Sequence, residues 1–259
     1  ATIGDTVNYK ITVTKGNGID KSITVHDKME AGLTLKEDSI KVDGVAYAYV
    51  DPADGCTFEV VLTEADFAAK TEIVITYSAT LDKTAEIFGA TNDNTAWLTY
   101  GTYEAAKDTV KVDTYKASFI KVDGTTKAAL EGVTFKLTDN AGTEIKLVDL
   151  TNGVYRVAMA GETAAEKITT PASGVIEIQG LGNGNYKLVE LSTLTGYNLL
   201  AGPVEFTIEN ANNLYSLNAV GVTDNNVIEN NMGTLLPSTG GMGTTLFYIV
   251  GGLMVVCAG

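Results

Sequence analysis

The chain has 259 residues, enough for one to three domains, and a formal net charge of −14 at pH 7. This acidic balance excludes a nucleic-acid-binding protein, which needs a basic face, and argues against electrostatic docking on anionic lipid. A single histidine and two cysteines leave almost nothing for a His-based metal site or a Ser-His triad, so we expect no metal, no cofactor and no enzyme.

The residues before position 116 alternate apolar and polar side chains with the period of two that is typical of half-buried β-strands. The inward positions of the first expected strand are Val7, Tyr9, Ile11 and Val13, and Lys10 faces the other way. Residues 63–66 resemble a capped single helical turn. Further strands are expected at 23–27, 39–42, 45–50, 57–62, 72–79, 94–100 and 109–115. Many short strands with little helix predict a β-sandwich.

The isolated histidine and cysteines have plain structural interpretations. We expect His26 to be a surface residue of the strand at 23–27. Cys257 lies in an apolar run near the end of the chain, so we expect no disulfide between it and Cys56.

The strand pattern restarts near residue 116. Strands are expected at 117–122, 133–137, 144–148, 154–158, 174–178, 185–191, 203–208, 214–219 and 226–230. There is no Pro- or Ser-rich linker, so the two sandwiches are expected to lie end to end with little slack. The predicted fold class is all-β, with two tandem immunoglobulin-like β-sandwich domains at 1–116 and 117–233. A C-terminal hydrophobic segment follows at 234–259.

Near the end of the chain stands the pentapeptide Leu236-Pro237-Ser238-Thr239-Gly240. Pro237 fixes its own φ and pushes Leu236 toward extended geometry, so the pentapeptide is expected to form a kinked, open strand. Gly240 has no Cβ, which lets an attacking group approach the Thr239 carbonyl.

An apolar run of 13 residues follows at 246–258. It is shorter than the roughly 20 residues that span a bilayer, so we expect that the given chain stops inside a membrane segment. The alternative is a proline turn that leads into an ordinary buried helix. Four glycines between 241 and 252 disfavour that alternative.

This arrangement resembles the sorting signal of Gram-positive surface proteins, which sortase transpeptidases cleave between Thr and Gly, here Thr239 and Gly240. The family's signal ends in a basic tail that is missing here. The resemblance implies a secreted protein that is anchored to the cell wall, has sortase and peptidoglycan as partners, and meets the membrane only transiently. No signal peptide opens the chain, so we also expect missing sequence upstream.

Residues 116–231 resemble the collagen-adhesin B-type domain of Gram-positive pilins. The matching segments are 119–123, 130–137, 184–190, 195–197 and 227–231, with Leu194 at a position where the family usually has proline. The resemblance implies an intramolecular amide between Lys121 and Asn230, which Glu190 promotes. Without the resemblance, solvated strand residues would be the favoured interpretation of the three side chains, because the sequence alone does not bring them together.

Alternation along the strands expected at 117–122 and 226–230 supports the expected amide between Lys121 and Asn230. Phe119 and Lys121 share a face, so a core Phe119 would carry Lys121 inward. Ile228 and Asn230 share a face in the same way, which favours Asn230 over Asn231 as the partner. In such a buried site a proton on Glu190 leaves Lys121 a neutral nucleophile. The protonated carboxyl could then donate to the Asn230 carbonyl and help ammonia to leave.

The first domain resembles the middle domain of backbone pilins through segments 4–9, 25–29, 32–34, 92–96 and 98–100. The resemblance implies an amide between a lysine upstream of Ala1 and Asn94, with Asp27 as the catalyst. Lys10 is expected to face away from the core and to be no substitute. The first domain of the given chain is therefore predicted to lack its amide.

Taken together, the resemblances imply a structural subunit of a covalently polymerised pilus, with neighbouring pilin subunits as partners. The acceptor lysine for polymerisation is expected in missing upstream sequence. The alternative is a wall-anchored adhesin or accessory pilin that binds host ligands. A lysine-bearing pilin motif upstream would favour polymerisation, and a long ligand-binding region would favour adhesion.

Overall fold

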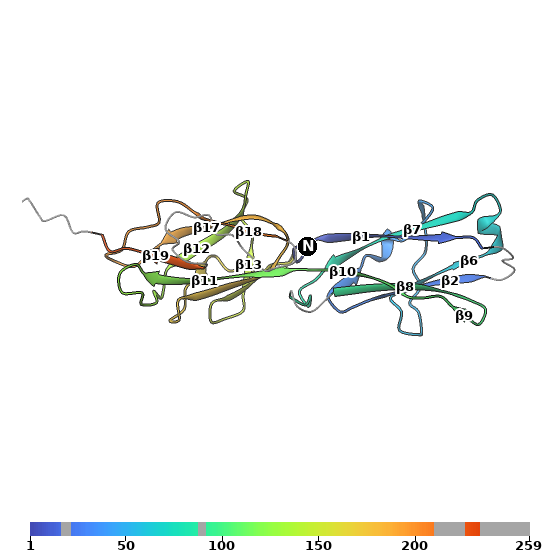
Figure 1. Cartoon of the computed structure of the whole chain (residues 1–259), viewed down its shortest axis with the longest axis horizontal. Coiled ribbons are helices and arrows are strands. Elements are labelled where there is room, and N and C mark those ends of the chain that lie inside the picture. The colour runs from blue at the N-terminus through green and yellow to red at the C-terminus, as the bar shows by residue number, and fades with distance from the viewer. Residues whose placement is uncertain (17–21, 88–91, 210–225, 234–259) are drawn as a thin grey trace, which may run out of the picture.

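The computed structural model describes residues 1–16, 22–87, 92–209 and 226–233, and it is an all-β protein (Figure 1). The sorting pentapeptide at 236–240, the apolar run at 246–258 and the strand expected at 214–219 lie outside the described residues. Within the described ranges, no helix is long and apolar enough to cross a membrane.

The first domain is a sandwich of two sheets, with strand orders β1-β7-β4-β5 and β10-β8-β2-β6; β3 also pairs with β7, and β9 with β8. The strands are β1 (Thr6–Thr14), β2 (Ile23–Met29), β3 (Leu33–Leu35), β4 (Lys41–Val42), β5 (Val45–Ala46), β6 (Phe58–Leu62), β7 (Glu72–Leu81), β8 (Asn92–Tyr100), β9 (Tyr103–Glu104) and β10 (Asp108–Val112). The 3-10 helices are η1 (Glu37–Ser39) and η2 (Glu64–Phe67), and Thr63 and Asp66 form the predicted capping box.

The second domain is also a two-sheet sandwich, with strand orders β13-β14-β16-β11-β19 and β15-β12-β17-β18. Its strands are β11 (Tyr115–Asp123), β12 (Thr134–Asp139), β13 (Leu147–Asp149), β14 (Val154–Val157), β15 (Ile168–Thr169), β16 (Val175–Leu181), β17 (Gly184–Ser192), β18 (Val204–Ile208) and β19 (Val227–Asn230). The strand β19 pairs with β11 in parallel, so the first and last described strands of this domain are neighbours.

The strand expected at 45–50 is mostly wrong, because only β5 forms a ladder there. Tyr47 and Tyr49 instead pack as partly buried side chains against the first-domain core. The alternation of residues 45–50 therefore reflects the packing of these two tyrosines on the core, and it does not indicate pairing with a neighbouring strand.

The two domains lie end to end, and the chain passes directly from β10 to β11 (Figure 1). Tyr115 and Lys116, assigned to the first domain from the sequence, are the first residues of the second-domain strand β11. The N-terminal residues lie at the junction (Figure 1): the Ile3 amide donates to the Gly180 carbonyl at 2.9 Å, and the Ala1 amine donates to the Asp113 carbonyl at 2.7 Å.

Ile3 belongs to an apolar cluster that contains the second-domain core and continues across the junction to Leu33, Ala79 and Leu81 of the first domain. Its side chain is 3% exposed. We expect Ile3→Ala to lower the free energy of unfolding by about 2–5 kcal/mol and to speed limited proteolysis at residues 113–114. Val13→Ala is the control, because Val13 is also 3% exposed but lies in the separate first-domain core. Equal cleavage rates at the junction in both variants would contradict this role of Ile3.

His26, expected on a strand surface, is only 9% exposed. It lies opposite Trp97 of the neighbouring strand β8, and the two rings stack with their centroids 5.1 Å apart. Alternation correctly places His26 on the outer face of its sheet, because the next residue, Asp27, is fully buried in the sandwich. The large cross-strand neighbour and the loop residues Asp54 and Cys56 cover the histidine.

Candidate crosslinking site

The centre of the second domain holds a buried lysine. Every second side chain of β11 points into the core. Those of Ala117, Phe119 and Lys121 have exposed fractions of 0%, 1% and 1%. A lysine in this register must bring its amine into the core, where a charged group needs a partner.

The partner strand places an asparagine beside it. Ile228 of β19 lies opposite Lys121, and Asn230 is two residues further along on the same face. Asn230 is 1% exposed, whereas Asn231 is exposed at the surface. The Lys121 Nζ donates to Asn230 Oδ1 at 2.5 Å, so the structure brings the lysine to Asn230 and not to its neighbour.

The third member comes from the opposite sheet. Glu190 lies in β17, and its side chain is 1% exposed. Its Oε1 atom lies 3.5 Å from Lys121 Nζ and accepts a hydrogen bond from Asn230 Nδ2 at 2.8 Å. The Leu200 amide donates to the other carboxylate oxygen at 2.8 Å, which holds the carboxyl group in place.

Sequence analysis missed a fourth residue, Thr193, whose Oγ1 lies 2.6 Å from Asn230 Nδ2. The two contacts of Nδ2, with Thr193 and Glu190, orient the amide so that its oxygen faces Lys121. No sequence pattern distinguishes this threonine, since it lies just beyond the end of β17 and shows no periodicity.

Burial lowers the pKa of Lys121 to about 8, although the nearby Glu190 carboxylate acts in the opposite direction. The site therefore favours a neutral amine far more than water does. Glu190 lies against the nitrogen of the Asn230 amide and not against its oxygen, contrary to one of the two roles expected from the sequence. This position suits a proton donor to the departing ammonia.

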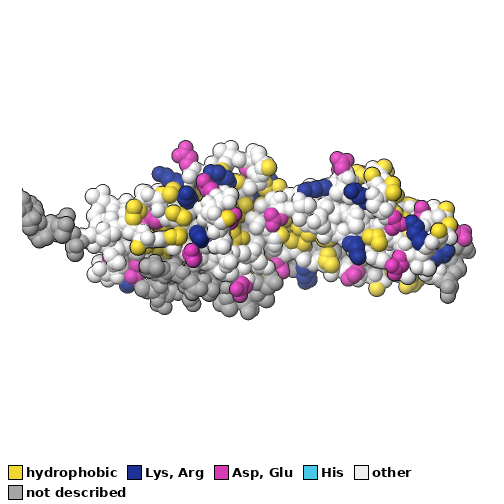
Figure 2. Space-filling view, turned by 90° about the horizontal axis from the view of Figure 1, so that it is seen from above, with side chains coloured by type: hydrophobic (Ala, Val, Ile, Leu, Met, Phe, Trp, Pro, Cys, Tyr) yellow, Lys and Arg dark blue, Asp and Glu magenta, His cyan; other side chains and the backbone are white. Residues whose placement is uncertain are grey.

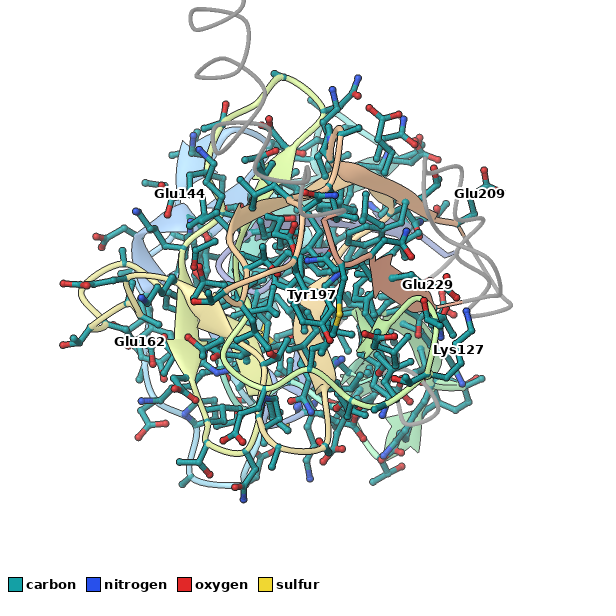
Figure 3. All side chains as sticks on the ribbon, turned by 90° about the vertical axis from the view of Figure 1, so that its left-hand side faces the viewer. Lys127, Glu144, Glu162, Tyr197, Glu209 and Glu229 are labelled. Carbon is teal, nitrogen blue, oxygen red and sulfur yellow. The ribbon has the colours of Figure 1, made fainter. Side chains whose placement is uncertain are left out.

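The 195–197 segment closes onto the end of β11. The Tyr197 hydroxyl donates to Asp123 Oδ2 at 2.6 Å, and Tyr197 forms a bridge with Met232 just after β19. Figure 3 looks onto this end of the domain, with Tyr197 near its middle and Glu229 and Lys127 to one side. The loop after β17 is thus attached to the two strands that carry Lys121 and Asn230.

The first domain has a second buried cluster. Asp27 of β2 is fully buried and Asn94 of β8 is 2% exposed. Asp27 Oδ2 accepts hydrogen bonds from Tyr77 OH at 2.5 Å and from Asn94 Nδ2 at 3.0 Å. Sequence analysis missed Tyr77, although its inward position in the alternating strand β7 was a usable signal.

Two acceptor atoms of this cluster are unpaired in the described part of the chain. The second oxygen of Asp27 and the amide oxygen of Asn94 are buried and have no hydrogen-bond partner among the described residues. Burial raises the pKa of Asp27 to about 6, against the effect of the Tyr77 and Asn94 hydrogen bonds. Buried polar atoms of this kind are normally paired, and both oxygens are free to accept a further hydrogen bond.

A cleft of about 580 Å³ opens beside the cluster, lined by Tyr77, Asn94 and residues of β1 and β10. The strands β1 and β10 are the end strands of their two sheets and do not pair with each other. Lys10 of β1 is exposed, while Tyr9 and Ile11 on either side of it are partly buried, as the alternation predicts. The exposed Lys10 forms no hydrogen bond with the two unpaired oxygens of the cluster.

The comparisons with known proteins agree with this architecture. Residues 115–223 match the SpaA family, described as a prealbumin-like fold domain. The pilus 2b backbone protein of group B streptococcus is 28% identical, with a TM-score of 0.65 over 92% of this chain and 96% of that chain. None of the curated proteins compared with the chain matches it.

Two less similar structures share the fold. The 35 kDa C-terminal fragment of the major pilin GBS80 of Streptococcus agalactiae is 20% identical, with a TM-score of 0.65 over 89% of this chain and 94% of that chain. The major pilin SpaA of Corynebacterium diphtheriae is 21% identical, with a TM-score of 0.57 over 89% of this chain and 65% of that chain. Residues 115–223 thus match the SpaA prealbumin-like domain, and the chain has the fold of Gram-positive pilus backbone proteins.

Proposed function

We propose that this chain is a structural subunit of a covalently polymerised pilus, displayed on the cell surface and anchored to the wall by sortase. The observation that carries the proposal is the buried set of Lys121, Glu190 and Asn230, which joins the first and last described strands of the second domain. The likeness to a pilus backbone protein over nearly the whole chain supports it. So does the elongated, end-to-end arrangement of the domains (Figure 1).

In this role the second domain crosslinks itself once. The Lys121 ammonium gives a proton to Glu190, and its neutral Nζ attacks the Asn230 side-chain carbonyl carbon. A new bond forms between Nζ and Cγ, and the bond from Cγ to Nδ2 breaks. Glu190 returns its proton to the departing nitrogen and receives one from Nζ, so the products are the amide, ammonia and one proton in total.

The crosslink changes how the domain carries force. Lys121 and Asn230 lie 109 residues apart in the chain but in adjacent parallel strands. Once they are joined, tension that enters β11 passes through the amide into β19, and the intervening sandwich is not loaded. A pilus shaft under tension needs such a path.

The first domain is proposed to complete its site with a lysine from a segment upstream of Ala1. This segment would lie in the cleft between β1 and β10, where two unpaired strand edges are available for backbone hydrogen bonds. Its amine would meet the unpaired oxygens of Asp27 and Asn94. Asp27, whose pKa is raised, would then carry the proton in the first domain, as Glu190 does in the second.

The surface is compatible with repeated head-to-tail contacts. Acidic and basic side chains are interspersed over the face shown in Figure 2, despite the formal net charge of −14. A mixed surface avoids the strong mutual repulsion that a single-sign face would create between subunits.

The proposal is tested by sortase transfer. Incubation of the full chain with a sortase and an amine should give a product whose new C-terminus is Thr239 joined to the amine, as mapped by mass spectrometry. The sortase thiolate attacks the Thr239 carbonyl, releases the chain from Gly240 onward and passes the acyl group to the amine. Pro237→Ala should abolish transfer because alanine does not fix φ at this position as proline does.

Ser238→Ala is the matched control, because the position between Pro237 and Thr239 is variable in the resembled signal. It should be processed like the unaltered chain. An adduct at any residue other than Thr239, or transfer that continues in Pro237→Ala, would overturn the proposed processing.

A further inference from the structure

The outer face of the first domain carries a cluster that the proposed function does not use. His26 of β2 lies opposite Glu59 of β6, and the loop that leads into β6 folds over both, bringing in Asp54 and Cys56. One donor atom from each of these four residues lies within 4.8 Å of the others. Imidazole, thiol and carboxylate are the donor types of zinc sites.

Three of the six separations between donor atoms match a tetrahedral ion. Donor atoms bound to one tetrahedral zinc lie about 3.3–3.7 Å apart, given metal–ligand lengths of about 2.0–2.3 Å. Here His26 Nδ1 lies 3.7 Å from both Asp54 Oδ2 and Cys56 Sγ, and Cys56 Sγ lies 3.3 Å from Asp54 Oδ2. His26 Nδ1 and Glu59 Oε1 are 2.6 Å apart, a hydrogen bond that must lengthen to admit a metal ion.

The histidine ring is already oriented for this role. Its far nitrogen, Nε2, is 3.0 Å from Thr99 Oγ1, and its face stacks on Trp97. The side chain is 11% exposed, so the ring is held while Nδ1 points at the three other donors. Metal-binding histidines commonly have such a second hydrogen bond, which sets the tautomer and the ring direction.

The Cys56 thiol has two carboxylates beside it and forms no disulfide among the described residues. Its Sγ lies 3.3 Å from Asp54 Oδ2, and the Glu59 carboxylate belongs to the same cluster. Two carboxylates beside a thiol and an imidazole would favour a divalent cation.

We propose that His26, Asp54, Cys56 and Glu59 form a binding site for a zinc-type divalent cation. Binding forms one bond from the metal to each of Nδ1, Sγ and the two carboxylates. The Cys56 thiol proton goes to solvent. The ring proton moves from Nδ1 to Nε2, so the bound imidazole stays neutral and its N–H faces Thr99 Oγ1. The ion fastens the loop at 51–57 to β2 and β6. Ca²⁺ and Mg²⁺ are excluded by the sulfur and nitrogen donors and the low coordination number.

The test uses Co²⁺ as a spectroscopic substitute for zinc on the full chain. Binding should produce the visible bands of tetrahedral Co²⁺ together with a near-ultraviolet thiolate-to-cobalt band. It should also quench the fluorescence of Trp97, which is the chain's single tryptophan and stacks on His26. Added Zn²⁺ should reverse both signals at one equivalent, and Ca²⁺ should leave both unchanged.

Two ligand variants test the assignment. Cys56→Ser should remove the near-ultraviolet band, and Glu59→Gln should weaken Co²⁺ binding by more than about 10-fold, since even outer partners of metal ligands are worth about 10–100-fold. Cys257→Ser alters the chain's other thiol, and Asp51→Asn alters an exposed acid of the same loop. Both controls should bind Co²⁺ like the unaltered chain.

Three results would overturn the proposal. The first is the absence of Co²⁺ bands and of Trp97 quenching in the folded unaltered chain. The second is a thiolate band that survives Cys56→Ser but is lost in Cys257→Ser. The third is octahedral Co²⁺ spectra with competition by Ca²⁺, which would mean a loose carboxylate site. Circular dichroism of each variant shows that a lost signal is not a lost fold.

Discussion

The full chain should weigh one ammonia less than its sequence mass, because Lys121 and Asn230 should be joined in an amide. Their reacting groups are in contact in a site that excludes water, and burial lowers the pKa of the lysine to about 8. Lys121→Ala and Glu190→Gln should both retain the full mass. Glu190→Gln is the sharper variant, since it keeps the shape of the side chain but cannot carry the proton.

The amide should also dominate the stability of the second domain. It closes a loop between residues 109 apart, and a covalent link across about 100 residues stabilises by about 4–5 kcal/mol in the chain-entropy treatment of disulfides. We expect Glu190→Gln to lower the free energy of unfolding by about that amount, as measured by denaturant titration of the full chain. The transition of the first domain should remain where it is.

Two substitutions on neighbouring surface residues are the controls. Lys127→Ala removes an exposed lysine that is paired with Glu229, and Asn231→Ala removes the exposed asparagine beside Asn230. Both variants should still lose ammonia. An unaltered chain of full mass would show that the buried set is only a hydrogen-bonded ion pair, and loss of ammonia in Lys121→Ala would assign the reaction to other residues.

The same mass measurement counts the amides in the given chain. We expect one and not two, because Asp27 and Asn94 meet no lysine amine among the described residues. A second lost ammonia, mapped to Asn94, would mean that Lys10 or another lysine of this chain reaches the first-domain cluster, and the proposal of an upstream lysine would fail.

The first domain should become less stable as the pH rises from about 4 to about 6, and Asp27→Asn should remove that loss. The pKa of Asp27 is raised from 3.8 to about 6 by burial, so between these values the folded state binds a proton that the unfolded state releases. Its contribution is fully present below about pH 4 and is lost as the pH passes about 6. A shift of about two units corresponds to about 3 kcal/mol.

Asp27→Asn keeps an acceptor for the Tyr77 hydroxyl and for Asn94 Nδ2, and it carries no charge at any pH. Denaturant titrations at pH 4 and pH 7 should therefore show a difference between the unaltered chain and the variant that changes by about 3 kcal/mol. Asp38→Asn, at an exposed acid of η1, is the control and should leave the pH profile unchanged. Parallel profiles for the unaltered chain and Asp27→Asn would contradict the raised pKa.

The alternation of apolar and polar residues in the two domains was sufficient to predict the all-β fold and the inward direction of particular side chains. Alternation placed Tyr9 inward and Lys10 outward in β1, and it placed Phe119 and Lys121 together in the core. Alternation also favoured Asn230 over Asn231, and the burial of Asn230 agrees with it. These inferences succeed because the side-chain period of a strand depends only on its own backbone.

Which strands face each other was decided only by the tertiary structure. Glu190 reaches Lys121 from the opposite sheet. Tyr77 becomes part of the first-domain cluster, and Thr193 part of the second-domain site, through contacts with residues of other strands. The burial of His26 under Trp97 has the same origin. A period of two records which side of its own strand a residue occupies. It carries no information on which distant strand covers that side, because sheet order follows from long-range pairing of the whole chain.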